Sequence, residues 1–258
     1  MMNLMKKYII VILLIINVIN LAAQNRKAPY KDDIYLGIKG GVNLASMKFT
    51  DKNLSSLPQN NAFRLLGGVF IDIPLTQIIG IAPEFAFVQR GMSTKYTHSS
   101  GIDVQYKINS NYVDFRLPVL FRFSVNPWCS PYLVGGVDAG YLLGGDITLK
   151  QEGMPIPEAS VAIGEANMSP LYLGAFGGIG CSLYTTGTKR NVQFKLEAVY
   201  NHGFLDTFSD KEKDESATPV NVNAYNHTGK RFQNGIEISL SVCISLKKAP
   251  NDACAGWK

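Results

Sequence analysis

The chain of 258 residues has few charged side chains, few cysteines and almost no tryptophan. Asp, Glu, Lys and Arg make up 17% of the residues, and Trp occurs only twice, against 12 Tyr and 13 Phe. After residue 23, no apolar run is long enough to cross a bilayer as a helix. The first of the four cysteines is Cys129, which excludes a lipid-modified cysteine near the N-terminus.

The first 23 residues have the pattern of a cleaved secretory signal peptide. Lys6 and Lys7 precede an apolar run over residues 8–21, and Ala22 and Ala23 provide small residues for cleavage. Removal of the two lysines lowers the formal net charge from +5 to +3, which is no footprint of nucleic-acid binding. We therefore expect an exported protein with no nucleic-acid partner.

Residues 236–246 alternate strictly between large aliphatic side chains and polar or small ones. Because a β-strand has a side-chain period of two, one face of this segment is apolar and the other polar. Its length is about what a tilted strand needs to cross a bilayer. The sequence therefore predicts an all-β fold, an eight-stranded antiparallel up-and-down transmembrane β-barrel with a filled lumen. Seven further segments alternate similarly: residues 34–44, 63–73, 81–90, 113–123, 133–141, 171–183 and 192–200.

The connections between the predicted strands alternate between short and long, as in outer-membrane barrels with periplasmic turns and extracellular loops. We therefore expect the protein in the outer membrane. The predicted parts are a signal peptide (1–23), a periplasmic leader (24–33), the barrel (34–247) and a periplasmic C-terminal tail (248–258). The short connections are residues 74–79, 124–130 and 185–190, and the long ones are residues 50–61, 93–103, 144–168 and 203–230.

Alternation alone does not decide which face is outside, since a soluble lipocalin-like barrel turns its apolar face inward around a ligand. Here the polar face is poor in Lys and Glu clusters, and no Gly-x-Trp motif opens the first strand. We therefore expect the apolar face to contact lipid. Glycine doublets inside the predicted strands indicate kinks or close approaches and no phosphate loop, so no cofactor is expected.

The polar face carries six cations and six anions. Eight strands leave an interior that side chains just fill, and unpaired buried charges are costly. We therefore predict a structural charge network in preference to an open pore, a proton relay or a catalytic site. Its members are Lys39, Arg64, Arg90, Arg116, Arg122 and Lys195 with Asp72, Glu84, Asp114, Asp138, Glu197 and Glu237.

Three further groups of residues invite a functional interpretation. His98, His202 and His227 lack metal-ligand spacing and lie in polar sequence, so we expect solvated histidines, no metal site and no enzymatic activity. Alternation continues through residues 96–108, which predicts a hairpin that protrudes above the bilayer. Its edge can bind a strand of a partner, or it is shielded by residues 144–168. The residues predicted for this hairpin are Tyr96, Val104, Tyr106 and Ile108.

The cysteines suggest one covalent link. Cys129 lies in a predicted periplasmic turn and Cys254 in the tail, whose eight residues past Leu246 can reach about 26 Å. A Cys129–Cys254 disulfide or two free thiols both fit an oxidising compartment. Cys181 and Cys243 read as ordinary strand residues, one facing lipid and the other the lumen.

Residues 37–45 (Gly-Ile-Lys-Gly-Gly-Val-Asn-Leu-Ala), 111–123 and 131–143 resemble segments of the PorT-like outer-membrane β-barrel proteins of the Bacteroidota. The resemblance covers roughly residues 34–247 and implies an eight-stranded outer-membrane barrel without catalytic residues. The family's namesake is tied to type IX protein secretion. We expect a non-catalytic barrel with a structural or protein-interaction role through its extracellular loops, in contact with lipid and with envelope or secretion proteins. An accessory role in type IX secretion and a narrow solute or ion channel are the alternatives.

Overall fold

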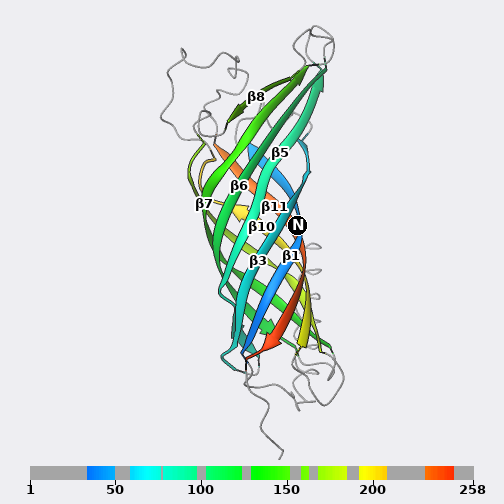
Figure 1. Ribbon diagram of the computed structural model, residues 1–258, viewed down its shortest axis with the longest axis vertical. Helices are drawn as coiled ribbons and strands as arrows, with labels where there is room; N and C mark the ends of the chain where they lie inside the picture. Colours follow the sequence, from blue (N-terminus) through cyan, green and yellow to red (C-terminus); the bar gives the residue numbers. More distant parts are fainter. Residues whose placement is uncertain are drawn as a thin grey trace, which may run out of the picture.

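The computed structural model describes residues 34–49, 59–76, 78–97, 103–123, 129–151, 158–162, 168–184, 192–207 and 230–246. Eight strands form an antiparallel ring, in which each strand pairs with the next and β1 pairs with β11 (Figure 1). The predicted eight-stranded up-and-down barrel is therefore confirmed. The ring consists of β1 (Tyr35–Phe49), β3 (Ala62–Pro74), β5 (Glu84–Thr97), β6 (Asp103–Arg122), β7 (Cys129–Gln151), β9 (Leu171–Tyr184), β10 (Val192–Gly203) and β11 (Arg231–Ser245).

Three short strands add to the ring: β2 (Gln59–Asn60), β4 (Ile79–Ile81) and β8 (Glu158–Ala162). β4 pairs with β3 and β6, so β4 and β5 act as one strand interrupted at Ala82 and Pro83. β2 pairs with β5, and β8 pairs with β7. Among the described residues, no helix is long and apolar enough to cross a membrane.

The two ends of the barrel differ in their connections. β3 ends beside the start of β4, β6 beside the start of β7 and β9 beside the start of β10 at the same end of the barrel, which we call the turn end. Ile34 and Leu246 meet there through a backbone hydrogen bond of 2.8 Å. We call the opposite end the loop end.

The apolar face of the strands points outward and the polar face points into the lumen. Ile38 and Ile179 are each 63% exposed and Phe63 is 76% exposed, whereas Lys195 and Asp138 are each 1% exposed. The direction predicted for the two faces is confirmed. A lipid-facing barrel has this arrangement, because hydrocarbon solvates the outer side chains and the charged ones must find partners inside.

β6 and β7, with 20 and 23 residues, are about twice as long as a strand needs to be to cross a bilayer. Together with β5 they rise above the rest of the ring at the top of Figure 1. The outward positions of β6 are apolar over residues 113–121 and polar over residues 105–111. β5 changes at the same level, because its outward Phe87 pairs with Val113 and its Gln89 pairs with Asn111.

The part of the sheet beyond this level, residues 89–97, 103–111 and 144–151 with β8, is called the sheet extension below. Sequence analysis placed residues 144–151 in a connection, and this was wrong. A β-bulge is the reason: Asn111 pairs with Gly144 and Tyr112 with Leu142, so the ladder skips one residue of β7. Gly144 and Gly145 have φ angles of +151° and +156°, which other residues rarely adopt. The bulge shifts the alternation of inward and outward residues by one position. A search for a period of two therefore does not detect the strand beyond it.

In each glycine doublet of the barrel strands, one glycine faces outward and the other faces the lumen. On β9, Gly178 faces the neighbouring strand so closely that an added Cβ would lie 2.7 Å from the Cα of Val199 and would also overlap the carbonyl oxygen of Ala198. At Gly177, the nearest atom to an added Cβ is the carbonyl oxygen of Val134, 3.9 Å away. The close approach at Gly178 lets β9 and β10 coil tightly, which a narrow barrel requires.

We therefore predict that Gly178→Ala destabilises the barrel and that the adjacent Gly177→Ala does not. Overpacking of this kind costs roughly 1–3 kcal/mol of unfolding free energy, because the backbone of β10 must move. The measurement is the urea midpoint of unfolding in lipid vesicles, read from the mobility difference between folded and unfolded barrel. Equal midpoints for the two variants would contradict this account of the doublet.

Candidate functional site

The charged lumen is assembled from alternate positions of seven strands, while β9 contributes aromatic rings such as Tyr172 and Phe176 instead. The charged side chains come from β1 (Lys39), β3 (Asp72), β5 (Glu84, Arg90), β6 (Asp114, Arg116, Arg122), β7 (Asp138), β10 (Lys195, Glu197) and β11 (Glu237). Each lies on the inner face because the period of two places it opposite the outward aliphatic residues of its strand.

Arg116 is the centre of the network. Its guanidinium donates two hydrogen bonds to the carboxylate of Glu237, with N–O distances of 2.7 and 2.6 Å. It also lies 3.9 Å from Glu84, 3.7 Å from Asp114 and 3.8 Å from Asp138. This planar fork, matched to one carboxylate and bordered by three others, lets a single cation hold four strands together.

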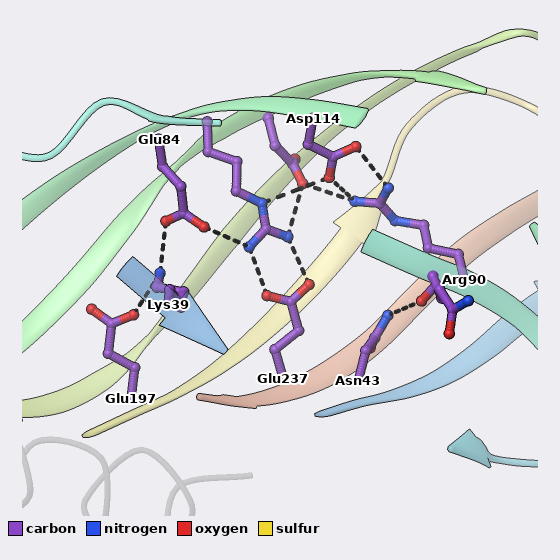
Figure 2. Close-up of polar contacts among 10 residues, drawn as sticks. Lys39, Asn43, Glu84, Arg90, Asp114, Glu197 and Glu237 are labelled. Carbon is purple, nitrogen blue, oxygen red and sulfur yellow. Dashed lines mark hydrogen bonds and ion pairs between the residues drawn. The ribbon is translucent and has the colours of Figure 1, made fainter. Parts of the chain in front are cut away.

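Lys39 connects the centre to the opposite wall. Its ammonium lies 2.6 Å from Glu84 and 2.8 Å from Glu197, and Figure 2 shows both carboxylates pointing at it from different strands. The Tyr132 hydroxyl donates to Glu197 over 2.7 Å. Every charge in this group therefore has a partner within hydrogen-bonding distance, as buried ions require.

Toward the loop end, Arg90 continues the network. It donates to both carboxylate oxygens of Asp114, at 3.0 and 2.5 Å, and lies 3.4 Å from Asp138. The guanidinium carbon sits 3.8 Å above the ring of Tyr172 and 5.2 Å from that of Tyr112. The π-electrons of the two rings thus stabilise the positive charge of the guanidinium beside its ion pairs with the carboxylates.

Toward the turn end, Asp72 accepts hydrogen bonds from two cations. Arg122 donates to one carboxylate oxygen and Lys195 to the other. The ammonium of Lys195 also lies 5.1 Å from the centre of the Phe70 ring. The ion pairs thus extend from the turn end, through Arg116, to the base of the sheet extension.

Arg64 lies apart from these pairs, although the sequence predicts it as a member of the network. It is only half-buried, and its guanidinium donates to the carbonyl oxygen of Ile108 over 2.9 Å. The pairing of β3 with β5 ends at Leu66 and Val88, so the side chain of Arg64 reaches past β5 to that carbonyl group. Arg64 therefore ties β3 to β6 where β5 leaves the ring.

Little space remains among the charges. A cavity of about 10 Å³ lies at the centre of the network, which is room for about one water molecule. Its charged lining consists of Lys39, Glu84, Arg116, Glu197 and Glu237. These side chains occupy the lumen at mid-height.

Of the three histidines, the structure describes only His202, which lies on β10. His202 Nδ1 lies 2.6 Å from the amide oxygen of Asn234, and its ring contacts Phe204. His98 and His227 lie outside the described residues. Within the described ranges, no three His, Cys, Asp or Glu side chains come together as a metal site.

The predicted hairpin forms, with Tyr96 of β5 paired to Val104 of β6. Its β6 edge is covered, because β7 pairs with β6 up to Val104 and places Leu149 beside Tyr106. Ile108 is only 2% exposed, so it cannot contact a partner directly as the sequence predicted. It stands beside the buried Met92 and Ile147 of the neighbouring strands, on the face that continues the lumen.

Cys129 is the first residue of β7 and not part of a turn, since the strand begins inside the connection predicted over residues 124–130. Its Sγ lies 2.7 Å from the Sγ of Cys181 on β9. Cys254, its predicted partner, lies outside the described residues. Sequence reasoning missed the proximity of Cys181, because only the register between β7 and β9 brings the two cysteines together. Alternation also predicts that Tyr132 and Tyr172 point inward, but it does not predict their partners.

The family model described as outer membrane protein beta-barrel domain matches residues 22–209, most of the chain. The chain belongs to this family. It is accordingly a small outer-membrane β-barrel, with the apolar outer face toward lipid and the charged lumen inside. No curated protein matches the chain.

Solved structures similar to this outer-membrane barrel include the Neisserial surface protein A, at 12% identity and a TM-score of 0.38, covering 82% of this chain and 96% of that one. Ail, the attachment invasion locus protein of Yersinia pestis, is 14% identical with a TM-score of 0.37, covering 83% and 98%. The outer membrane protein OprG from Pseudomonas aeruginosa is 11% identical with a TM-score of 0.34, covering 83% and 93%.

We predict that Arg116→Met destabilises the barrel by about 3–5 kcal/mol, because it leaves Glu237 buried without its cation. The double variant Arg116→Met with Glu237→Gln should recover a large part of this loss, since it removes the uncompensated charge as well. The urea midpoint of unfolding in lipid vesicles measures both effects. A double variant no more stable than the single one would show that the bidentate pair is not what Arg116 contributes.

Proposed function

We propose that this barrel is a non-catalytic outer-membrane scaffold that presents the sheet extension to another protein of the envelope or of the surroundings. The observation that carries the proposal is the continuation of β5, β6 and β7 past the level at which the outer face turns from apolar to polar. Lipid contact gives no reason for these strands to continue, because hydrocarbon ends where the apolar band ends.

The extension is rigidly joined to the barrel. Residues 104–111 of β6 pair with both β5 and β7, so the extension has the same backbone ladder as the wall. Gln89 donates to the side chain of Asn111 over 3.0 Å, and Asn109 donates to Asp146 over 3.2 Å. A binding surface held in this way loses little conformational entropy when a partner docks.

The outward edge of the extension offers a binding mode. β8 is the last strand in the order of the described sheet and pairs there with β7 over Asp146–Lys150. A terminal strand can pair with an extended segment of another protein. The exposed Lys95 of β5 adds a charge that disfavours uncontrolled strand pairing on the other side.

The orientation and the ends of the chain complete the proposal. The turn end faces the periplasm and the sheet extension faces outward, as the lengths of the connections favour. Residues 1–23 act as a signal peptide, 24–33 as a periplasmic leader and 248–258 as a periplasmic tail.

Type IX secretion and solute passage are the other candidate functions. The segments that resemble PorT-like proteins, residues 37–45, 111–123 and 131–143, all lie in wall strands, so the resemblance concerns the barrel and no binding residue. The two experiments below separate these candidates from a scaffold.

The partner is tested with a photo-crosslinking amino acid at Glu158, in β8 at the edge of the sheet extension, and with the same probe at Leu240 of β11 as a control. Leu240 is 57% exposed on the outer face within the apolar band, where lipid surrounds it. We expect the probe at position 158 to capture a protein in intact cells and the probe at position 240 to capture only lipid. Capture of secretion components would favour the secretion role, and no protein adduct at position 158 would refute the proposal.

Conductance tests the filled lumen. We expect the wild-type protein in a planar bilayer to show no large, steady conductance, because ion pairs occupy the lumen at the level of Arg116. The variant Arg116→Ala with Glu237→Ala keeps the net charge and removes both central side chains, so it should conduct measurably more. A steady wild-type conductance equal to that of the variant would favour a channel over a scaffold.

A further inference from the structure

Two of the three cysteines in the described part of the chain lie on the same face of adjacent strands. Cys129 is on β7 and Cys181 on β9, and the register pairs Cys129 with Leu183 and Pro131 with Cys181. The cysteines are therefore diagonal neighbours across one antiparallel ladder. Both are half-buried on the outer face, beside the turn end, where β7 begins and β9 is about to finish.

Their side chains point at one another. The sulfur atoms lie 2.7 Å apart, whereas a disulfide joins its sulfurs at about 2.05 Å. The two sulfur atoms are thus within about 0.7 Å of bonding distance. The ladder that holds the two strands together runs from Cys129 to Tyr141 on β7.

The third cysteine cannot compete for either sulfur. Cys243 of β11 is fully buried on the inner face, in a cluster with Tyr35, Phe70 and Tyr132. The strand wall separates it from the outer face that carries the other two. Cys254 lies outside the described residues and is the competitor that an experiment must distinguish.

We infer that Cys129 and Cys181 form a disulfide once the protein has left the reducing cytoplasm, in the oxidising envelope where outer-membrane barrels assemble. Each thiol gives up one proton and one electron as the S–S bond forms. The two electrons pass to a disulfide oxidant by thiol–disulfide exchange, and the oxidant's own S–S bond is reduced to two thiols.

The bond reports and fixes the register of β7 against β9. A slip of one residue would turn one cysteine to the opposite face, because side chains alternate along a strand. The disulfide therefore forms only when this seam is correctly paired. It then closes residues 129–181 into a covalent loop, which contains the whole of β7 and β8 and the first eleven residues of β9.

The test is a peptide map of the full-length protein, purified from the envelope, with free thiols alkylated in denaturant and without reduction. We expect a linked peptide pair that contains Cys129 and Cys181, separated by a reductant. Cys243→Ser and Cys254→Ser should keep this pair, while Cys181→Ser should lose it. Alkylation of all cysteines in the wild type, or a linked pair of Cys129 with Cys254, would overturn the inference.

A second measurement tests the bond in the wild-type protein. Reduction should lower the urea midpoint of unfolding of the wild-type barrel, because the disulfide no longer restricts the unfolded chain. The same treatment should leave the midpoint of the double variant Cys129→Ser with Cys181→Ser unchanged. A wild-type midpoint that does not respond to reduction would count against a disulfide that fixes the seam.

Discussion

Pairing of buried charges is the interaction on which this barrel depends. A narrow ring of eight strands has no room for bulk water, so each charged side chain that points inward must meet an opposite charge or a ring. Arg116 meets Glu237 from β11 and borders carboxylates of β5, β6 and β7, while Lys39 joins β1 to β5 and β10. The backbone ladder closes the ring, and the ion pairs specify how its walls face each other.

The outer face is governed by a different requirement. Aliphatic and aromatic side chains cover it up to one level, which Phe87 and Val113 mark on β5 and β6. Beyond that level the same strands continue with polar outward residues. The outward side chains therefore show which part of each strand contacts lipid and which part contacts water. The proposed scaffold function uses the part of the strands whose outward residues are polar.

The alternation of residues predicts the strands, their inner and outer faces and the charged members of the lumen, because each of these depends on the period of two alone. It does not predict which charges pair. That Arg116 bonds to Glu237 depends on contacts across the lumen between residues 121 positions apart. Where a glycine bulge shifts the phase, as at Gly144, the pattern fails locally and the strand is missed. The contact of Arg64 with Ile108 and the proximity of Cys181 to Cys129 likewise depend on how the strands pair, which alternation does not predict.

The closing seam between β1 and β11 has a consequence for biogenesis. These strands pair along their whole length, from Tyr35 opposite Ser245 to Phe49 opposite Arg231. β11 also carries Glu237, the bidentate partner of Arg116. Without β11, Arg116 would lose its bidentate carboxylate, and β1 and β10 would each be left with an unpaired edge. Closure of the ring and completion of the central ion pair therefore happen in the same step.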